Sequence, residues 1–266
     1  MIIVAERINA TRKSIREALE NKDEAFIANE AVAQFEAGAD FIDLNAGANL
    51  ETEARDLHWM VDVVENVVED ARIALDSSSS EAILKTVNKV KNTPMINSIS
   101  LETKKFEEMK PAVEARESDI IALSLDDKGL PKSSDQAFDN AERIVTGLDK
   151  LGVKRERIFI DPLVDPISVD NNNGLKALDT IRRIHEDIEG VNIICGLSNV
   201  SFGLPERFLI NRTFLAIAIS YGLNAAIADP LDKKLMSAAV VAEMLVGKDK
   251  HSRKYLNKFR KKEIFG

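Results

Sequence analysis

Short apolar segments alternate with longer amphipathic segments along this chain of 266 residues, and this alternation limits the fold more than any other feature. The short segments are rich in Ile, Val, Leu and Phe and show no clean polar alternation, which is typical of strands covered on both faces. Strands are therefore expected at Ile2–Ala5, Phe41–Leu44, Arg72–Leu75, Pro94–Ile96, Ile120–Leu125, Arg157–Ile160, Val191–Cys195 and Asn224–Ala228.

The segments between these strands carry apolar residues at helical spacing. Glu24–Ala37, for example, has apolar residues three and four positions apart, and Gly38 follows it as a typical helix stop. The other helices are expected at Thr52–Glu69, Glu81–Val90, Lys104–Glu117, Asp135–Leu151, Leu175–Glu189, Pro205–Tyr221 and Leu231–Leu245.

Strict alternation of strands and helices requires parallel strands joined by right-handed crossovers. Eight repeats in a chain close to the usual length of about 250 residues favour a closed barrel over an open doubly wound sheet. We therefore predict an α/β protein that consists of a single (β/α)8 TIM barrel over residues 1–266, with residues 248–266 as a basic C-terminal helix or tail.

The charge balance argues against nucleic acid as a partner. The chain has 36 Lys and Arg against 44 Asp and Glu, a net charge of −8, whereas nucleic-acid affinity comes largely from basic side chains. Residues 248–266 are basic, and this run is either a solvated helix or a docking patch for an acidic partner. No apolar run reaches the ~18–20 residues of a membrane span and the N-terminus does not resemble a signal peptide, so we expect a cytoplasmic protein without a membrane partner.

In a barrel of this type the chemistry lies at the carboxyl ends of the strands. The polar residues at these ends are Glu6, Arg7 and Asn9; Asp43 and Asn45; Asp76 with Ser77, Ser78, Ser79 and Ser80; Asn97, Ser98 and Ser100; Ser124, Asp126 and Asp127; Asp161 and Asp165; Ser198, Asn199 and Ser201; and Asp229. This set is rich in carboxylates and carboxamides and contains neither histidine nor cysteine. A zinc site, a nucleophilic triad and a Gly-rich phosphate loop are therefore not expected.

A ring of Asp and Asn side chains suits a neutral heterocycle that carries a row of hydrogen-bond donors and acceptors. An ionised Asp accepts two parallel N–H bonds and an Asn both donates and accepts, and the 2-amino-4-oxo edge of a pterin presents this pattern. Two other interpretations stay open. Asp76 and the serines after it could cap a helix, and Asp43, Asp76 and Asp161 could bind a divalent metal ion.

Six short segments at these strand ends occur in the order of a known family. They are Glu6-Arg7-Ile8-Asn9, Asp43-Leu44-Asn45, Ala74-Leu75-Asp76-Ser77, Ile96-Asn97-Ser98, Ile160-Asp161-Pro162 and Gly196-Leu197-Ser198-Asn199-Val200-Ser201. Over essentially its whole length the chain resembles the pterin-binding methyltransferases that work with corrinoids. The resemblance is to methyltetrahydrofolate:corrinoid/iron-sulfur-protein methyltransferase and to the methylcorrinoid:tetrahydrofolate methyltransferases of demethylation systems, and more distantly to the folate module of cobalamin-dependent methionine synthase.

The resemblance implies a methyl transfer between N5 of tetrahydrofolate and the cobalt of a corrinoid that a partner protein carries, with no metal bound by this chain. It implies that Asn199 is the catalytic amide that hydrogen-bonds N5. A donor that tightens as N5 gains charge stabilises the transition state preferentially. The family also implies a homodimer, and it leaves the net direction of transfer open.

The same resemblance gives the other site residues. The residues implied to bind the pterin or folate are Asp76, Asn97 and Asp161 on the ring with Asp43 close by, Gly196 and Ser198 in the loop that borders the ring, and Arg207 at the anionic glutamate tail. Phe202 departs from the pattern, because a polar residue that contacts the pterin is expected there.

Two other functions compete with this interpretation. Dihydropteroate synthase shares the barrel and the pterin pocket, but it normally brings Ser-Arg-Lys after strand seven, where this chain has Ser198-Asn199-Val200. A non-catalytic folate-binding barrel would share the pterin residues without needing Asn199. The chain does not carry the corrinoid itself, because Asp56-Leu57-His58 begins the D-x-H-x-x-G motif of corrinoid modules but Val61 replaces its glycine, so His58 is expected to be an ordinary helix residue.

Overall fold

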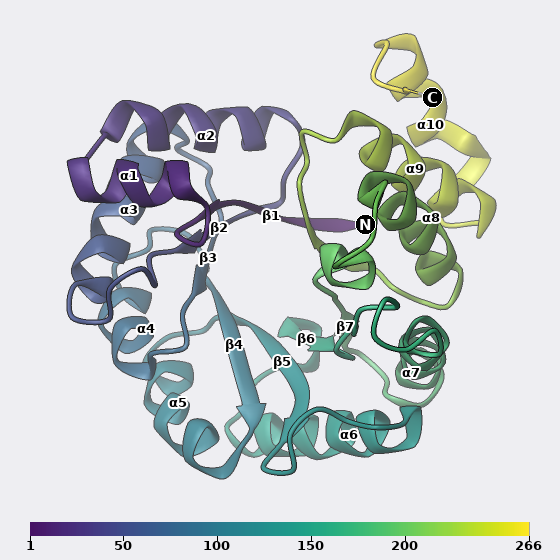
Figure 1. The fold of residues 1–266 in the computed structure, drawn as a ribbon, viewed down its shortest axis with the longest axis horizontal. Coiled ribbons are helices and arrows are strands. Elements are labelled where there is room, and N and C mark those ends of the chain that lie inside the picture. Colours follow the sequence, from purple (N-terminus) through teal and green to yellow (C-terminus); the bar gives the residue numbers. More distant parts are fainter. Residues whose placement is uncertain (266) are drawn as a thin grey trace.

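The computed structural model describes residues 1–265, and these residues form the predicted barrel (Figure 1). Its strands are β1 (Ile2–Asn9), β2 (Phe41–Asn45), β3 (Ile73–Asp76), β4 (Met95–Leu101), β5 (Asp119–Asp126), β6 (Ile158–Asp161), β7 (Asn192–Ile193) and β8 (Ala225–Ala228). They pair in parallel in the order β7-β6-β5-β4-β3-β2-β1-β8. Every predicted strand is therefore confirmed.

The barrel closes where β7 meets β8. Gly196 and Ile227 form an isolated parallel bridge. The backbone N–H of Ile227 donates to the carbonyl of Cys195 at 2.9 Å, and that of Asn224 donates to the carbonyl of Ile193 at 3.3 Å. These bonds join the two strands that would be edges of an open sheet, and Figure 1 shows the resulting ring of strands within a ring of helices.

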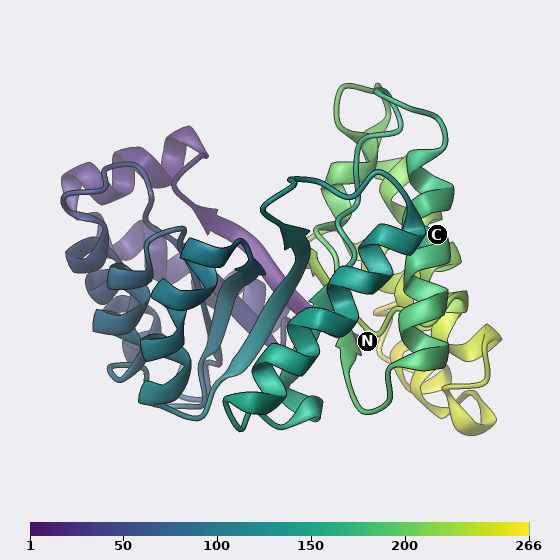
Figure 2. The ribbon, with the colours of Figure 1, turned by 90° about the horizontal axis from the view of Figure 1, so that it is seen from below.

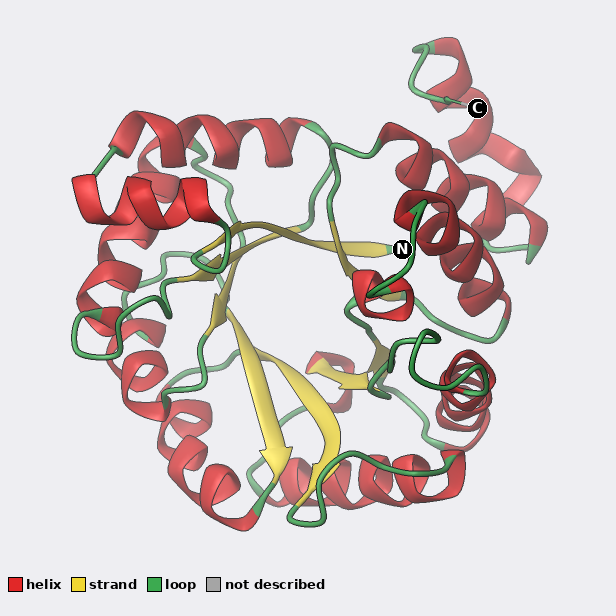
Figure 3. Cartoon of the chain, viewed as in Figure 1, coloured by secondary structure: helices red, strands yellow, loops and turns green. Residues whose placement is uncertain are grey.

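The helices surround the strands, as Figure 3 shows by colour. The predicted helices are confirmed as α2 (Glu24–Glu36), α3 (Glu53–Val67), α4 (Ser80–Val87), α5 (Thr103–Ala115), α6 (Ser134–Lys150), α7 (Asn173–Asp187), α8 (Arg207–Ser220) and α9 (Lys233–Leu245). The structure adds α1 (Lys13–Asn21) between β1 and α2, and the short 3-10 helices η1 (Arg155–Arg157), η2 (Leu197–Ser201) and η3 (Lys250–Ser252).

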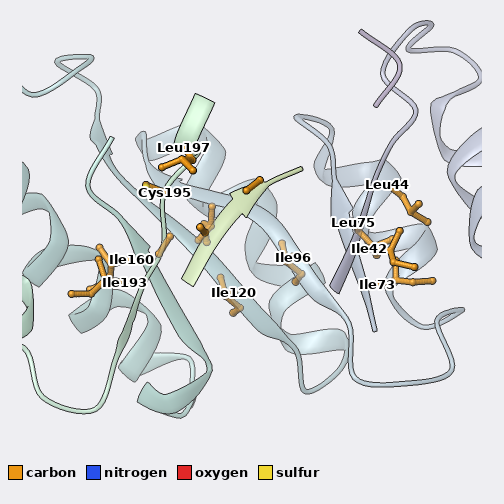
Figure 4. Packing of buried hydrophobic residues seen from close by; sticks show 14 of the residues in the cluster. Ile42, Leu44, Ile73, Leu75, Ile96, Ile120, Ile160, Ile193, Cys195 and Leu197 are labelled. Atoms are coloured by element: carbon orange, nitrogen blue, oxygen red, sulfur yellow. The ribbon is translucent and has the colours of Figure 1, made fainter. Parts of the chain in front are cut away.

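Alternation along each strand divides the apolar residues into two cores. Side chains such as Ile42, Leu44, Ile73 and Ile160 point outward, pack against the helices and belong to one buried cluster, of which Figure 4 labels ten residues on different strands and loops. The side chains of the opposite parity fill the inside of the barrel: Val4, Phe41, Ala74, Met95, Ile121, Phe159, Ile194 and Ala225. Residues two apart in a strand face the same side, so this inner layer decides which residues line the space above it.

The basic C-terminal segment includes the helix α10 (Arg253–Arg260) and lies against the outside of the barrel. Lys254 Nζ lies 2.6 Å from Glu243 Oε2 near the end of α9, and the N-terminal amine of Met1 contacts the same carboxylate. Figure 2 shows this yellow segment toward the end of the barrel away from the strand arrowheads. Among the helices of residues 1–265, none combines the length and the apolar character that a membrane span requires.

Candidate functional site

A layer of polar side chains lies on top of the inner apolar layer at the carboxyl end of the barrel. Moving two residues along each strand from the inner apolar residues leads to five polar side chains, Glu6, Asp43, Asp76, Asn97 and Asp161, and to Leu123, Gly196 and Ile227. The period of two places these side chains on the inner face as well. The change from apolar to polar residues along the same face therefore builds a polar floor directly above a dry core.

One strand needs an irregularity to contribute more than once. The pairing of β1 with β2 shifts its register between Ala5 and Ile8, and a bulge of this kind re-aims the side chains beside it. As a result Glu6, Arg7 and Asn9 all reach the same cavity.

The polar floor belongs to a cavity of about 730 Å³. Of the residues that the sequence predicted for the site, Asp43, Asp76, Asn97, Gly196, Ser198, Asn199 and Arg207 line it. The remaining lining residues are Glu6, Arg7, Asn9, Thr11, Arg12, Leu197, Phe208, Asn211, Ile227, Ala228, Asp229, Asp232 and Leu235. Residues far apart in the sequence are thus brought together at one end of the barrel.

Two carboxylates in the floor are held by neutral amides rather than by cations. Asn97 Nδ2 donates to Asp43 Oδ1 at 3.1 Å, and Asn45 Nδ2 donates to Asp76 Oδ2 at 3.0 Å. Asn9 Nδ2 also reaches Asp76 Oδ2, at 3.5 Å. Within residues 1–265 the second oxygen of each carboxylate, Oδ2 of Asp43 and Oδ1 of Asp76, accepts no hydrogen bond. Each is therefore available to an N–H group of a ligand.

Burial raises the pKa of these carboxyl groups, none of which forms an ion pair within residues 1–265. Burial raises the pKa of Asp43 well above its usual range, and the charge of Asp76 raises it further. Burial likewise raises the pKa of Asp76 to about 6, although the hydrogen bond from Asn45 opposes the shift. The pKa of Glu6 rises to about 7, first because of burial and second because of Asp229. A ligand that donates hydrogen bonds to these groups would stabilise the ionised carboxylates and lower their pKa values.

Asp161 is the one predicted pterin residue that does not line the cavity in the described part of the chain. Its side chain is buried at the end of β6, and its Oδ1 accepts a hydrogen bond from the backbone N–H of Leu163 at 2.8 Å. Burial raises the pKa of Asp161 to about 6, while the backbone N–H groups of Leu163 and Gly196 lower it. In this structure Asp161 braces the loops after β6 and β7.

Asn199 lies in η2, the 3-10 helix that follows β7. Within residues 1–265 its carboxamide makes no hydrogen bond, and only its backbone is held, by bonds to Gly196 and Phe202. A Cβ on Gly196 would lie 3.1 Å from Asn199 Nδ2, so the amide rests over the bare backbone of the glycine. The side chain of Asn199 is therefore exposed, free of partners and placed at the edge of the cavity.

Three arginines line the cavity in different states. Arg7 is saturated, because its guanidinium lies 2.8 Å from Glu30 and 2.9 Å from Asp229. Arg207 instead donates from Nη2 to the carbonyl of Ser198 at 2.7 Å. Arg12 donates from Nη1 to the carbonyl of Arg7 at 2.9 Å. Neither Arg12 nor Arg207 forms an ion pair within residues 1–265, so both guanidinium groups are available to an anionic ligand.

Phe202 does not disturb the cavity. Its side chain is 63% exposed and is not among the lining residues of the described chain. Its backbone carbonyl accepts a hydrogen bond from Ser168 Oγ at 2.7 Å, and the Arg207 guanidinium lies 5.9 Å from its ring centroid. The departure from the family pattern at this position therefore falls on the outer surface.

Asp76 and the serines after it have different roles at the start of α4. Ser79 caps α4, since its side chain accepts from the backbone N–H of Ala82. Ser77 supports the same turn by accepting from Ser79 N at 2.9 Å and donating to the buried Glu53 at 2.5 Å. Asp76 takes no part in the cap and faces the cavity. In residues 1–265 there is no group of three or more His, Cys, Asp or Glu side chains that could hold a metal ion, Asp43, Asp76 and Asp161 included.

Several cavity residues were missed or left without a role by the sequence reasoning. Glu6, Arg7, Asn9 and Asp229 stand at strand ends, and their spacing of two from inner apolar residues could have identified at least Glu6. Arg12, Phe208, Asn211 and Asp232 come from loops and helix starts, where no such period exists. Asn211 is notable because its buried Oδ1 finds no partner within residues 1–265, and its spacing of four from Arg207 on α8 is the only sequence signal for it.

Comparisons with known proteins identify the family of this chain. The family model described as pterin binding enzyme matches residues 5–229. The chain is 34% identical over 266 residues to the methylcorrinoid:tetrahydrofolate methyltransferase of Eubacterium limosum. This match covers 99% of this chain and 98% of that protein. Over 243 residues the chain is 26% identical to the methionine synthase of Mycobacterium leprae (strain TN), which is 85% of this chain but 20% of that protein.

Solved structures share the fold at lower identity. The dihydropteroate synthase of Xanthomonas albilineans with 4-aminobenzoic acid superposes with a TM-score of 0.69 at 18% identity, covering 92% of this chain and 90% of that chain. The dihydropteroate synthase of Coxiella burnetii in complex with pteroic acid gives 0.67 at 16% identity, covering 94% and 93%. These similarities support the barrel architecture.

Proposed function

The chain belongs to the family of pterin-binding enzymes, and on that premise we propose that it is a methyltransferase acting between tetrahydrofolate and a corrinoid. The methyl group moves between N5 of the folate and the cobalt of a corrinoid that a partner protein holds. The name of the Eubacterium limosum relative gives the direction from methylcorrinoid to tetrahydrofolate. The same direction is proposed for this chain in its cellular role.

The observation that carries the proposal is the pair Asp43 and Asp76 in the cavity floor. Each offers one oxygen without a donor and has a raised pKa. The 2-amino group and the adjacent ring N–H of a pterin are neutral donors that match two such acceptors. A ligand without these donors would leave buried polar atoms unpaired, which makes the pocket selective.

The remaining predicted residues take their roles around this head group. Asn97 presents its amide beside Asp43, and Gly196 and Ser198 form the wall next to Asn199. Asp161 acts from behind this wall by fixing the loop, and Arg207 stands at the mouth, where an anionic tail would leave. The pocket thus accepts a neutral, donor-rich ring at its floor and negative charge at its opening.

Asn199 is proposed as the catalytic residue. In the proposed direction N5 gains positive charge as it takes the methyl group, and the carboxamide oxygen of Asn199 can stabilise that charge by accepting a hydrogen bond from N5–H. In the reverse direction the methyl group leaves N5 poorly unless that nitrogen is protonated or strongly hydrogen-bonded. Because the carboxamide of Asn199 has no internal partner in the described chain, it can turn to N5 and strengthen its bond as charge changes there, which lowers the barrier rather than only improving binding. The corrinoid supplies the cobalt that donates or accepts the methyl group, so this chain needs no nucleophile of its own.

The partner is proposed to approach over the open end of the cavity. Exposed aromatic side chains stand at this end, with Phe202 and Phe208 exposed by 63% and 64%. The family resemblance also implies a homodimer, and a cytoplasmic location is proposed as well. The outer face of α8, where Leu209 and Ile217 are exposed, and the exposed Tyr221 directly after it offer apolar surface for contact between copies.

The test is direct methyl transfer to free corrinoid. Purified protein is mixed anaerobically with methyltetrahydrofolate and chemically reduced cobalamin, and the cobalt(I) absorption is followed as methylcobalamin forms. The reverse reaction starts from methylcobalamin and tetrahydrofolate. Asn199→Ala should lower the turnover number by about 10²–10³-fold, the usual effect of removing one donor to a developing charge, while folate binding changes little.

Asn21→Ala serves as the matched control, because it removes an exposed carboxamide at the end of α1 that bonds only to Glu17. Its rate should equal that of the wild type. Folate binding without reaction in either direction would contradict methyl transfer and favour a binding barrel. Formation of dihydropteroate from a hydroxymethylpterin pyrophosphate and 4-aminobenzoate would favour the dihydropteroate synthase alternative.

A further inference from the structure

The wall of the cavity is divided by charge. The acidic side chains at the floor are shielded, with Asp43 only 2% exposed and Glu6 and Asp76 half-buried. The two arginines without acidic partners, Arg12 and Arg207, are exposed at the opening. A ligand that fills this space meets acceptors at one end and positive charge at the other.

Arg12 and Arg207 differ from the third arginine of the cavity. Arg7 is neutralised by Glu30 and Asp229. Within residues 1–265 no carboxylate lies within 4.0 Å of the guanidinium of Arg12 or of Arg207. The first turn of α1, which starts directly after Arg12, contains no acidic residue either. Although the chain has a net charge of −8, the opening of the cavity thus carries two arginines without an ion-pair partner in the described residues, which favours an anionic group of a ligand there.

Both arginines are also held in place by the backbone. Arg12 Nη1 donates to the carbonyl of Arg7, whereas Arg207 donates from Nη2 to the carbonyl of Ser198 and from Nε to Ser201 Oγ at 3.1 Å. These bonds use part of each guanidinium and leave its other N–H groups for a ligand. A side chain that is fixed in advance loses less conformational entropy when the ligand arrives.

The two arginines line the same cavity although they come from distant elements. Arg12 precedes α1 and Arg207 begins α8, yet the positive charges of both lower the pKa of Glu6, which burial otherwise raises. Glu6, Arg12 and Arg207 all line this cavity, so the two positive charges and the carboxyl group lie on the same side of the barrel.

We infer that Arg12 and Arg207 together form a carboxylate-binding site that recognises the α- and γ-carboxylates of the folate glutamate. The inference rests on the proposed function, since it assigns the two arginines to the tail of the same ligand whose ring occupies the floor. It adds Arg12, which the sequence did not single out, and it gives the enzyme a preference for folates that carry the anionic tail. Arginine suits this role because its planar fork matches a carboxylate with two parallel N–H bonds.

The experiment measures dissociation constants by calorimetry for two ligands that differ only in the tail. One is 5-methyltetrahydrofolate, and the other is the neutral 5-methyltetrahydropteroylamide, which lacks the glutamate. Wild-type protein should bind the folate about tenfold more tightly, the order of magnitude of a charge-assisted hydrogen bond at a solvated site. Arg12→Gln should remove most of that preference by weakening folate binding while leaving amide binding unchanged.

Lys13→Gln is the control, because it removes the same charge at the next position from a side chain that is 88% exposed and paired with Glu17. It should change neither dissociation constant by more than about twofold, since Lys13 does not line the cavity and an exposed charge is weakened by solvent and salt. Arg12→Lys should restore only part of the preference, because an ammonium cannot form the parallel pair. Raising the salt concentration should shrink the effect of Arg12→Gln on folate and leave the amide untouched.

Each other outcome overturns the inference in a recognisable way. If Arg12→Gln weakens the binding of both ligands equally, Arg12 supports the structure of the turn between β1 and α1 and does not bind the tail. No weakening of either ligand removes Arg12 from the site. Failure of wild-type protein to bind both ligands contradicts the proposed function itself, whereas binding of both with equal affinity contradicts only the tail site.

Discussion

The two ends of the barrel both bury carboxylates, but they treat them in opposite ways. At the amino end, Asp119 at the start of β5 is 5% exposed and lies between two arginines, with Arg72 Nη2 at 2.5 Å and Arg157 Nη1 at 3.2 Å. At the carboxyl end, Asp43 is 2% exposed and receives only the amide of Asn97, with the like charge of Asp76 nearby. Asp119 is paired with two cations, whereas Asp43 has no cationic partner within residues 1–265 and one of its oxygens accepts no hydrogen bond.

The comparison indicates that the buried carboxylate at the amino end stabilises the fold, whereas the one at the carboxyl end is available to a ligand. A buried carboxylate costs free energy unless charges and hydrogen bonds compensate it. Burial raises the pKa of Asp119 as well, but the positive charges of Arg72 and Arg157 oppose that shift. No cation plays this part beside Asp43, and only the amide of Asn97 lowers its pKa. The carboxyl end therefore holds unsatisfied acceptors whose cost falls when a donor-bearing ligand binds.

The largest expected effect is on ligand affinity at the carboxyl end. Asp76→Asn replaces an acceptor oxygen of the floor by an amide, so the affinity for tetrahydrofolate should fall about 100-fold, or roughly 2.7 kcal/mol. The free energy of unfolding at pH 8 should stay equal or rise, because a carboxylate that is costly to ionise has been removed. Calorimetric titration and urea denaturation measure the two quantities. Loss of stability together with unchanged affinity would reverse the assignment of the two ends.

A smaller and opposite effect is expected at the amino end. Asp119→Asn should lower the free energy of unfolding by about 1–2 kcal/mol, because two guanidinium groups lose their shared partner. The loss stays moderate since Arg72 is 43% exposed and Arg157 also contacts Glu117. The dissociation constant for tetrahydrofolate, measured as for Asp76→Asn, should not change. A drop in folate affinity would mean that the two ends are coupled through the barrel.

The third expected effect concerns the pH dependence of stability, which reports on the ionisation of the polar floor. The Glu6 carboxyl ionises near its ordinary pKa of 4.5 when the chain is unfolded and near a pKa of about 7 when it is folded. As the pH rises through this window the unfolded state loses its proton first, so the stability that protonated Glu6 contributes is lost between pH ~4.5 and ~7 and stays constant above. Glu6→Gln should therefore flatten the fall in unfolding free energy between pH ~4.5 and ~7 and leave the slope above pH ~7 unchanged. A series of urea denaturations from pH 5 to 8 checks this, and parallel curves for the two proteins would assign the pH dependence elsewhere.

The sequence predicted the order of the elements well because the signal is local. Apolar runs and helical spacing survive in any environment, so every expected strand and helix appears. The misses have physical causes. β4 was expected at Pro94–Ile96 but runs over Met95–Leu101, because the inward-facing Asn97 breaks the apolar run where the strand enters the polar floor. The helix α1 was overlooked although Ile15, Ala18 and Leu19 have helical spacing, since its nine residues are short and highly charged.

The candidate site was predictable only as far as it sits on strands. Asp43, Asp76 and Asn97 follow apolar strand residues, so position alone brought them to the carboxyl end of the barrel. Asp161 obeys the same rule but turns its carboxylate toward the backbone of the next loop. Arg12 and Asn211 lie on loop and helix, and which way they point depends on how those elements pack.

By itself, then, the sequence determined the barrel, the end that carries the chemistry and the acidic and amide character of that end, because residue type and strand period are properties of the local chain. Only the tertiary structure decided which carboxylates remain without a cation and which arginines remain without an acid. Those pairings join residues such as Arg7 and Asp229, or Arg72 and Asp119, that are far apart in the sequence. Their presence or absence is fixed by distances of a few ångströms that no local pattern encodes.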